Sequence, residues 1–87
     1  MHAVIVRVSI KDRDSADKSL REEVVPRVSQ APGFVTGYWT RKDNTGLSMI
    51  IFNSEEEANR ASELIPSMVP DSVTLEGVEV REVAAHA

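Results

Sequence analysis

The sequence lacks cysteine and contains few aromatic residues, and both shortages limit what the protein can be. None of its 87 residues is a cysteine, which excludes disulfides, thiol nucleophiles and metals bound by cysteine. Aromatic side chains make up only 5% of the chain, with one Trp, one Tyr and two Phe. The formal net charge is −4 at pH 7, so we expect no nucleic-acid partner.

Long apolar runs are also missing. A helix that spans a membrane needs about 20 apolar residues in succession. The segment "AVIVRVSI" near the start is shorter and is interrupted by Arg7, so it is neither a span nor the core of a signal peptide. We therefore expect a cytoplasmic protein without membrane contact. Residues 1–87 are expected to form a single domain, and a domain of this size buries only ~60% of the surface of its unfolded chain.

The first part of the chain has the pattern of a strand followed by a helix. Residues 2–10 alternate between apolar and other positions, as a strand does. Asp14 or Ser15 can cap a following helix, because short polar side chains accept hydrogen bonds from its first turn. The apolar stripe of this helix repeats every four residues: Ala16, Leu20, Val24 and Val28. Pro26 lies inside the helix and predicts a kink or a tightened turn at residues 22–25.

Two strands joined by a polar turn follow. The segment "APG" ends the helix, and residues 34–41 alternate as a second strand. The segment "KDNTG" predicts a hairpin turn in which Asn44 or Gly46 takes a positive φ. The third strand, residues 47–52, has apolar residues at almost every position rather than at alternate ones.

The final part repeats the order of helix and strand. Ser54 and Glu57 have the spacing of a capping box, which predicts the start of a second helix. Pro66 lies near its expected end. Residues 73–83 form the last predicted strand, in which the apolar parity changes and Gly77 indicates a bulge or a bend.

This order predicts an α+β, ferredoxin-like βαββαβ fold. Right-handed crossovers would place strands one and three at the centre of a four-stranded antiparallel sheet, with both helices on one face. The other face would then need a cover, since the third strand is apolar on both sides. Leu47, Met49 and Ile51 lie on one of its faces, and Ser48, Ile50 and Phe52 lie on the other.

An uncovered apolar sheet face of several hundred Å² is larger than a soluble monomer usually exposes. The simplest cover is a second copy of the chain, so we expect a homodimer through sheet faces that buries ~1,200 to 2,000 Å² in total. We place Ile50 at that interface and predict that Ile50→Asp weakens the dimer, because a desolvated carboxylate there costs several kcal/mol. The alternatives are a monomer whose outer face is shielded by side chains such as Arg7 and Arg41, and a different partner chain.

The segment "PGFVTGYWTRKDNTGLSMIIFNSEEEANRA", residues 32–61, resembles the antibiotic-biosynthesis-monooxygenase-like proteins of the dimeric α+β barrel superfamily. The start "PGF" of the second strand and the step "FNSEEEA" into the second helix carry the likeness, together with "LREEVVPRVSQAPGF" upstream. The resemblance implies a dimer through sheet faces and a cavity beside the sheet that binds small molecules. Some such proteins oxidise polyketide-like aromatic compounds without metal or flavin, some degrade haem, and many have no known activity.

The chain departs from the haem-degrading pattern of that superfamily. The pattern has an asparagine on the first strand, a tryptophan at the end of the third strand and a histidine in the second helix. Here the first strand offers Val6, Arg7 and Val8, Phe52 stands at the tryptophan position, and the second helix has no histidine. These departures from the pattern argue against haem degradation.

Four residues are candidates for ligand binding: Arg7, Tyr38, Trp39 and Phe52. Tyr38 and Trp39 are adjacent on a strand, so one faces the helices and the other faces away. An aromatic side chain beside a cavity can hold a flat ligand, although core or interface packing explains such residues more often. The Arg7 guanidinium can clamp a carboxylate, or it can form an ordinary salt bridge.

No residue pattern identifies a catalytic group, a cofactor or a metal. His2 and His86 are the only histidines, and two imidazoles are too few for a secure metal site. We expect a homodimeric protein that binds a small aromatic molecule and needs no cofactor. If it is catalytic, cofactor-free oxygenation of the ligand is the leading reaction. The alternative is a non-catalytic module for dimerisation or ligand sensing.

Overall fold

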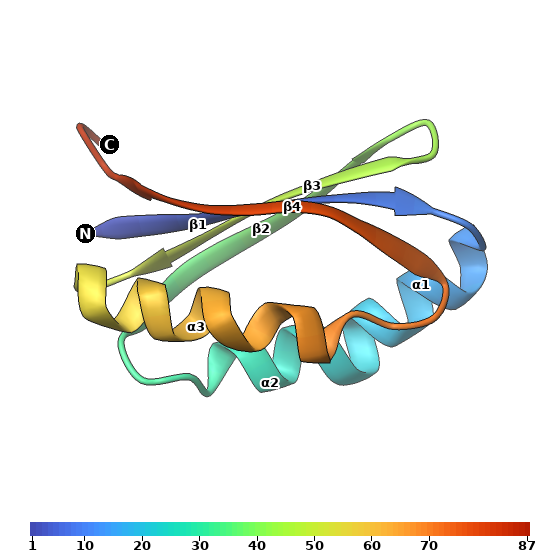
Figure 1. Ribbon diagram of the computed structural model, residues 1–87, viewed down its shortest axis with the longest axis horizontal. Helices are drawn as coiled ribbons and strands as arrows, with labels where there is room; N and C mark the ends of the chain where they lie inside the picture. The colour runs from blue at the N-terminus through green and yellow to red at the C-terminus, as the bar shows by residue number, and fades with distance from the viewer.

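Four antiparallel strands form one sheet, and the helices all lie on one face of it (Figure 1). This computed structural model describes residues 1–87. The elements are β1 His2–Ile10, α1 Arg13–Ser19, the π-helical segment η1 Leu20–Val24, α2 Val25–Ser29, β2 Phe34–Lys42, β3 Thr45–Phe52, α3 Glu55–Met68 and β4 Val73–Glu82. The strand order is β2-β3-β1-β4, which confirms the predicted ferredoxin-like fold with strands one and three at the centre.

The core lies between the sheet and the helices, and strand alternation selects its members. Val4 on β1 pairs with Ile50 on β3 and with Val80 on β4, so these side chains share the helix-facing side of the sheet. The buried cluster consists of Val4, Val6, Val28, Ile50, Phe52, Ala58 and Ile65. Phe52 is completely buried and meets the ring of Phe34 edge to face, with 6.3 Å between ring centroids.

The prediction that Ile50 lies at a dimer interface is wrong. Ile50 is only 2% exposed and belongs to the core beneath the helices. The opposite face of β3 carries Leu47 and Met49, which are 43% and 45% exposed. The sequence left the choice open because both faces of this strand are apolar, and only the packing of the helices decides between them. A carboxylate at position 50 would enter the core and destabilise the fold itself.

The first helix differs from its prediction at two places. Its cap is Asp12 rather than Asp14 or Ser15, and the Asp12 carboxylate accepts a hydrogen bond of 3.2 Å from the Ser15 N–H. The turn before Pro26 is widened into η1 instead of tightened: the Val25 N–H donates to the Leu20 carbonyl, five residues back. Pro26 has no N–H, and its ring crowds the preceding turn, so the wider turn relieves both problems.

The β2–β3 hairpin has its positive φ at Asp43, with φ 55°, rather than at Asn44 or Gly46. Aspartate tolerates this conformation because its short side chain can bond to the local backbone. Gly46 is needed for a different reason: a Cβ at this position would lie 2.8 Å from a methyl carbon of Val8. β3 begins at Thr45, two residues before the predicted start.

The predicted start of the second helix at Ser54 and the predicted irregularity at Gly77 are both confirmed. The Glu57 N–H donates to Ser54 Oγ at 3.2 Å, and Ser54 Oγ donates to the Glu57 carboxylate at 3.0 Å. On β4 the pairing with β1 shifts between Gly77 and Leu75, as an extra residue in a bulge requires. Neither α3 nor any other helix has the length and apolar character needed to cross a membrane.

Leu64 and Ile65, two adjacent aliphatic residues of α3, provide a test of this packing. Ile65 is 7% exposed and Leu64 is 57% exposed. Ile65→Ala should lower the free energy of unfolding by about 2 to 5 kcal/mol, because it removes buried methyl groups and leaves a cavity. Leu64→Ala should change it by no more than about 0.5 kcal/mol. Urea denaturation followed by circular dichroism measures both, and equal losses would contradict the assigned orientation of α3.

Candidate functional site

A cavity of about 530 Å³ lies between the sheet and the first helical stretch. Residues of all four strands, α1, η1, the end of α3 and the segment between α3 and β4 line the cavity. Twelve of the twenty lining residues are hydrophobic. The volume lies within the range of ~300 to 1,000 Å³ typical of small-molecule sites, and its mainly apolar lining is typical of them too.

The helical wall of the cavity comes from the predicted apolar stripe. Ala16, Leu20 and Val24 are spaced by four residues and all line the cavity. Leu20 and Val24 are the two ends of η1, so the π-helical segment directly shapes this wall. Such segments occur often at functional sites.

Trp39 lies at the sheet side of the cavity. Its cross-strand partner is Ser48, which pairs in turn with Val6 on β1, and all three residues line the cavity. The indole ring extends over Gly37, where a Cβ would lie 2.8 Å from the ring carbon Cη2. The missing side chain of Gly37 therefore provides the space that the Trp39 ring occupies.

A second row of α1 and η1 residues, beside the apolar row, carries charge. Arg13, Asp17 and Arg21 are again spaced by four and line the cavity. From the other side of the cavity, Arg41 of β2 forms an ion pair and hydrogen bond with the Asp17 carboxylate. The side chains of this pair are 32% and 34% exposed, so the contact joins helix and sheet where the cavity meets solvent.

The four candidate ligand-binding residues do not share one pocket. Trp39 lines the cavity, whereas Phe52 is fully buried in the core and is absent from the lining. Tyr38 and Arg7 lie on the opposite, open face of the sheet, as the register with Met49 and Leu47 shows. Of the adjacent aromatic pair, Trp39 thus faces the helices and Tyr38 faces away, as alternation predicted.

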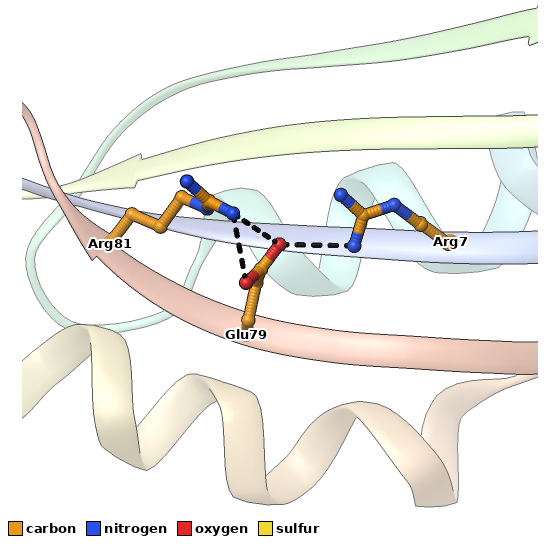
Figure 2. A network of polar contacts seen from close by, with 3 residues as sticks. All are labelled: Arg7, Glu79 and Arg81. Atoms are coloured by element: carbon orange, nitrogen blue, oxygen red, sulfur yellow. Dashed lines mark hydrogen bonds and ion pairs between the residues drawn. The ribbon is translucent and has the colours of Figure 1, made fainter.

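Arg7 belongs to an ionic network on the open face (Figure 2). Its Nη1 donates to Glu79 Oε1 at 3.0 Å, and Arg81 Nη2 donates to Glu79 Oε2 at 3.2 Å. The hydrogen bond from Arg7, followed by the one from Arg81, holds the pKa of Glu79 below its ordinary value. The structure therefore shows the ordinary salt bridge that was one of the two interpretations of Arg7.

The other half of the open face is apolar and exposed. Tyr38 is 64% exposed, and Leu47 and Met49 beside it on β3 are almost half exposed. Arg41 does not shield this surface, because it lies on the helix side at the cavity. On the open face, exposed apolar side chains lie on β2 and β3, whereas Arg7 of β1 and Glu79 and Arg81 of β4 carry charge. Ala3 and Ile5 of β1, between them, are apolar and buried.

The two histidines lie outside the cavity. His2 Nε2 lies 3.2 Å from a carboxylate oxygen of Glu55, in the first turn of α3, and His86 follows the end of β4. No group of three or more His, Asp or Glu side chains in the structure is arranged to hold a metal ion.

The sequence interpretation missed the charged rim of the cavity, Arg13, Asp17 and Arg21. It considered none of these three residues as part of a site. The four-residue spacing next to the apolar stripe was the available signal. It has little weight alone, because charged residues beside an apolar stripe occur on most amphipathic helices.

No protein-family model and no curated protein matches the sequence. Three solved structures are similar in fold. MupZ from Pseudomonas fluorescens has a TM-score of 0.65 and 14% identity over 91% of this chain, which spans 65% of the length of MupZ. A dimeric ferredoxin-like protein from an uncultured marine organism has a TM-score of 0.64 and 12% identity, covering 100% of this chain and 98% of that one.

The third structure is MhuD from Mycobacterium tuberculosis, described as a heme-degrader with two hemes bound in its active site. Its TM-score is 0.55, with 16% identity over 97% of this chain and 98% of that chain. At these identities the likeness establishes the ferredoxin-like fold. Activity and ligand depend on side chains, and most of these differ.

The ionic network predicts a pKa for Glu79 that depends on Arg7. In an NMR pH titration, Glu79 should titrate below the ordinary glutamate pKa, and Arg7→Gln should raise its pKa because the main hydrogen-bond donor is lost. Because the folded pKa is lowered, the network stabilises the fold above the unfolded pKa of Glu79, and this effect disappears as the pH falls through the folded pKa. Arg60→Gln, which affects only the Glu56 pair on α3, should leave Glu79 unchanged.

Proposed function

We propose that the protein is a homodimeric small-molecule-binding protein whose ligand occupies the cavity between the sheet and α1–η1. The observation that carries the proposal is the cavity itself, with Trp39 on one wall and an apolar helical row on the other. An indole beside an apolar cavity suits a flat aromatic ligand, which can stack on the ring. This is the type of ligand implied by the resemblance to cofactor-free monooxygenase-like proteins.

A small side chain at the cavity supports binding rather than simple packing. Ala16 lines the cavity at a position where a larger residue would fill it. The cavity of about 530 Å³ is partly open to solvent, so water can fill it, and its mainly apolar lining offers that water few hydrogen bonds. A ligand of matching shape would displace this water and contact the lining.

The homodimer is proposed on the basis of the open face. Tyr38, Leu47 and Met49 form an apolar strip, and a two-fold axis would place the strip of one copy against that of the other. The network around Glu79 would lie at the polar rim of such an interface, where charged pairs are usual. The similarity in fold to a protein described as dimeric and ferredoxin-like supports this arrangement.

Haem degradation is not part of the proposal. The fold is shared with a heme-degrader, but α3 of this chain contains no histidine, and Phe52 lies sealed in the core. β1 offers Val6, Arg7 and Val8 where the haem-degrading pattern has its asparagine. The residues that the resemblance would require are therefore replaced.

The alternative function is a non-catalytic module for dimerisation or ligand sensing. One observation favours it: the exposed strip of Tyr38, Leu47 and Met49 is a surface for assembly that requires no occupant in the cavity. The ion pairs of Glu79 with Arg7 and Arg81 lower its pKa on that face, and they explain the shift without a catalytic role.

The dimer can be tested by sedimentation. At micromolar concentration the protein should sediment near twice its mass of 9.6 kDa. Met49→Asp should shift it towards the monomer, because a carboxylate buried between two sheets costs several kcal/mol. Leu64→Asp introduces the same charge on an exposed position of α3 and should leave the dimer intact. A Met49→Asp variant that sediments like the parent would exclude this face as the interface.

Ligand binding can be tested with the neutral aromatic probe 2-naphthamide. Binding should change the fluorescence of Trp39, which is the only tryptophan and lines the cavity. Ala16→Leu should weaken binding at least ~10-fold because it fills the cavity, and each tenfold loss corresponds to ~1.4 kcal/mol. Ala85→Leu, in the exposed segment after β4, is the control for added apolar surface. Equal affinities of both variants would place the probe elsewhere.

A further inference from the structure

We propose that the cavity accepts an anionic amphiphile, namely a molecule with an apolar body and a carboxylate that is held by arginines at the cavity rim. This inference rests on the proposed function, since it assigns the chemical class of the ligand in the same cavity. Arg41 is the central contact in this assignment, and Arg13 and Arg21 provide the surrounding positive charge.

The local charge at the cavity is opposite in sign to that of the whole protein. The chain has a formal net charge of −4, with 14 acidic and 10 basic residues. The charged residues that line the cavity, in contrast, are three arginines and one aspartate. A concave apolar site surrounded by one sign of charge concentrates the electrostatic field and raises the local concentration of ligands of the opposite sign.

The positive charge lies at the rim and not at the base of the cavity. Along the helix the charged row of Arg13, Asp17 and Arg21 runs beside the apolar row of Ala16, Leu20 and Val24. Arg13 and Arg21 are exposed, whereas Val6 and Ile50 at the sheet side are buried. An amphiphile fits this division, with its apolar body towards the sheet and its charged group near solvent.

Two of the three rim arginines have no acidic partner. The ion pairs of the structure involve Arg7, Arg41, Arg60 and Arg81, and neither Arg13 nor Arg21 takes part in one. Asp17 lies between them on the helix but points its carboxylate to Arg41. The rim therefore keeps unneutralised guanidinium groups next to an apolar cavity.

Arg41 can exchange Asp17 for a ligand or hold both at once. A guanidinium has five N–H donors, and the structure shows a single bond, from Nη1 to Asp17. Its planar fork matches a carboxylate with two parallel hydrogen bonds, which a neutral amide cannot accept in the same way. About two thirds of the Arg41 side chain is withdrawn from water, since it is 32% exposed, so screening there is weaker than on an open surface.

The experiment compares 2-naphthoate with 2-naphthamide, which share one ring system and differ in charge. Isothermal titration calorimetry at neutral pH and low salt should show 2-naphthoate binding at least ~10-fold more tightly. Arg41→Gln should remove most of this preference while the affinity for 2-naphthamide stays within about twofold. The preference should also decrease as NaCl is added, since salt screens partly exposed charges.

Arg27→Gln is the matched control. Arg27 is an exposed arginine of α2 that does not line the cavity, so its substitution changes the net charge equally without altering the rim. It should retain the preference for 2-naphthoate. Should Arg41→Gln fold poorly, as judged by circular dichroism, the double variant Arg13→Gln/Arg21→Gln replaces it and should reduce the preference as well.

The possible results separate the two proposals. If 2-naphthamide binds in the cavity as tightly as 2-naphthoate, the anionic ligand class is overturned while the small-molecule site stands. If Arg27→Gln removes the preference as fully as Arg41→Gln does, the preference comes from overall charge, and the assignment to the rim is overturned. If neither probe binds, both proposals lose their support.

Discussion

The architecture depends on one mismatch: the sheet has apolar side chains on both faces, but the helices cover only one. Across the four strands, Gly37, Ile50, Val4 and Val80 form one row towards the helices. The neighbouring row on the open face reads Tyr38, Met49, Ile5 and Glu79. The first row closes the core, and the second changes from apolar to charged across the sheet. The proposed assembly and the proposed ligand binding thus use opposite faces of the same four strands.

The cavity exists because the helix-facing side of the sheet is not filled evenly. At one end Phe52 and Ala58 are fully buried members of a closed core. At the other end Gly46 and Ser48 offer little side-chain volume, and the β2–β3 hairpin rises away from α1 in Figure 1. The π-helical turn before Pro26 also changes how the helix presents Leu20 and Val24 there. Dense packing and open space thus occur within one small core.

The fold could be predicted from the sequence to a large extent, because each element has a local cause. Alternation defines β1, the pair Ser54 and Glu57 begins α3, and Gly77 marks the bulge in β4. The prediction for the first helix failed at Pro26, since a proline can be accommodated by a wider as well as by a tighter turn. Local propensity does not distinguish these two solutions, and packing of the helix on the sheet does.

The candidate site was predicted less completely than the fold. Alternation predicted that Tyr38 and Trp39 face opposite sides of the sheet but not which of them faces the helices, and the resemblance implied a cavity beside the sheet. Phe52 and Tyr38 were grouped with Trp39 because all are aromatic, but parity and burial separate them. Arg41 was considered only as a shield for the open face. The structure shows that Arg41 instead lines the cavity and pairs with Asp17, which lies 24 residues earlier in the chain.

The sequence by itself determined the order of elements, the strand parity, the capping of α3 and the excess of apolar strand surface, since these follow from interactions between near neighbours in the chain. Only the tertiary structure decided which face of β3 is core, that Arg41 meets Asp17, and that a cavity remains between α1–η1 and the sheet. These features arise from contacts between distant segments. Their geometry depends on how whole elements pack, which the pattern of any single element does not contain.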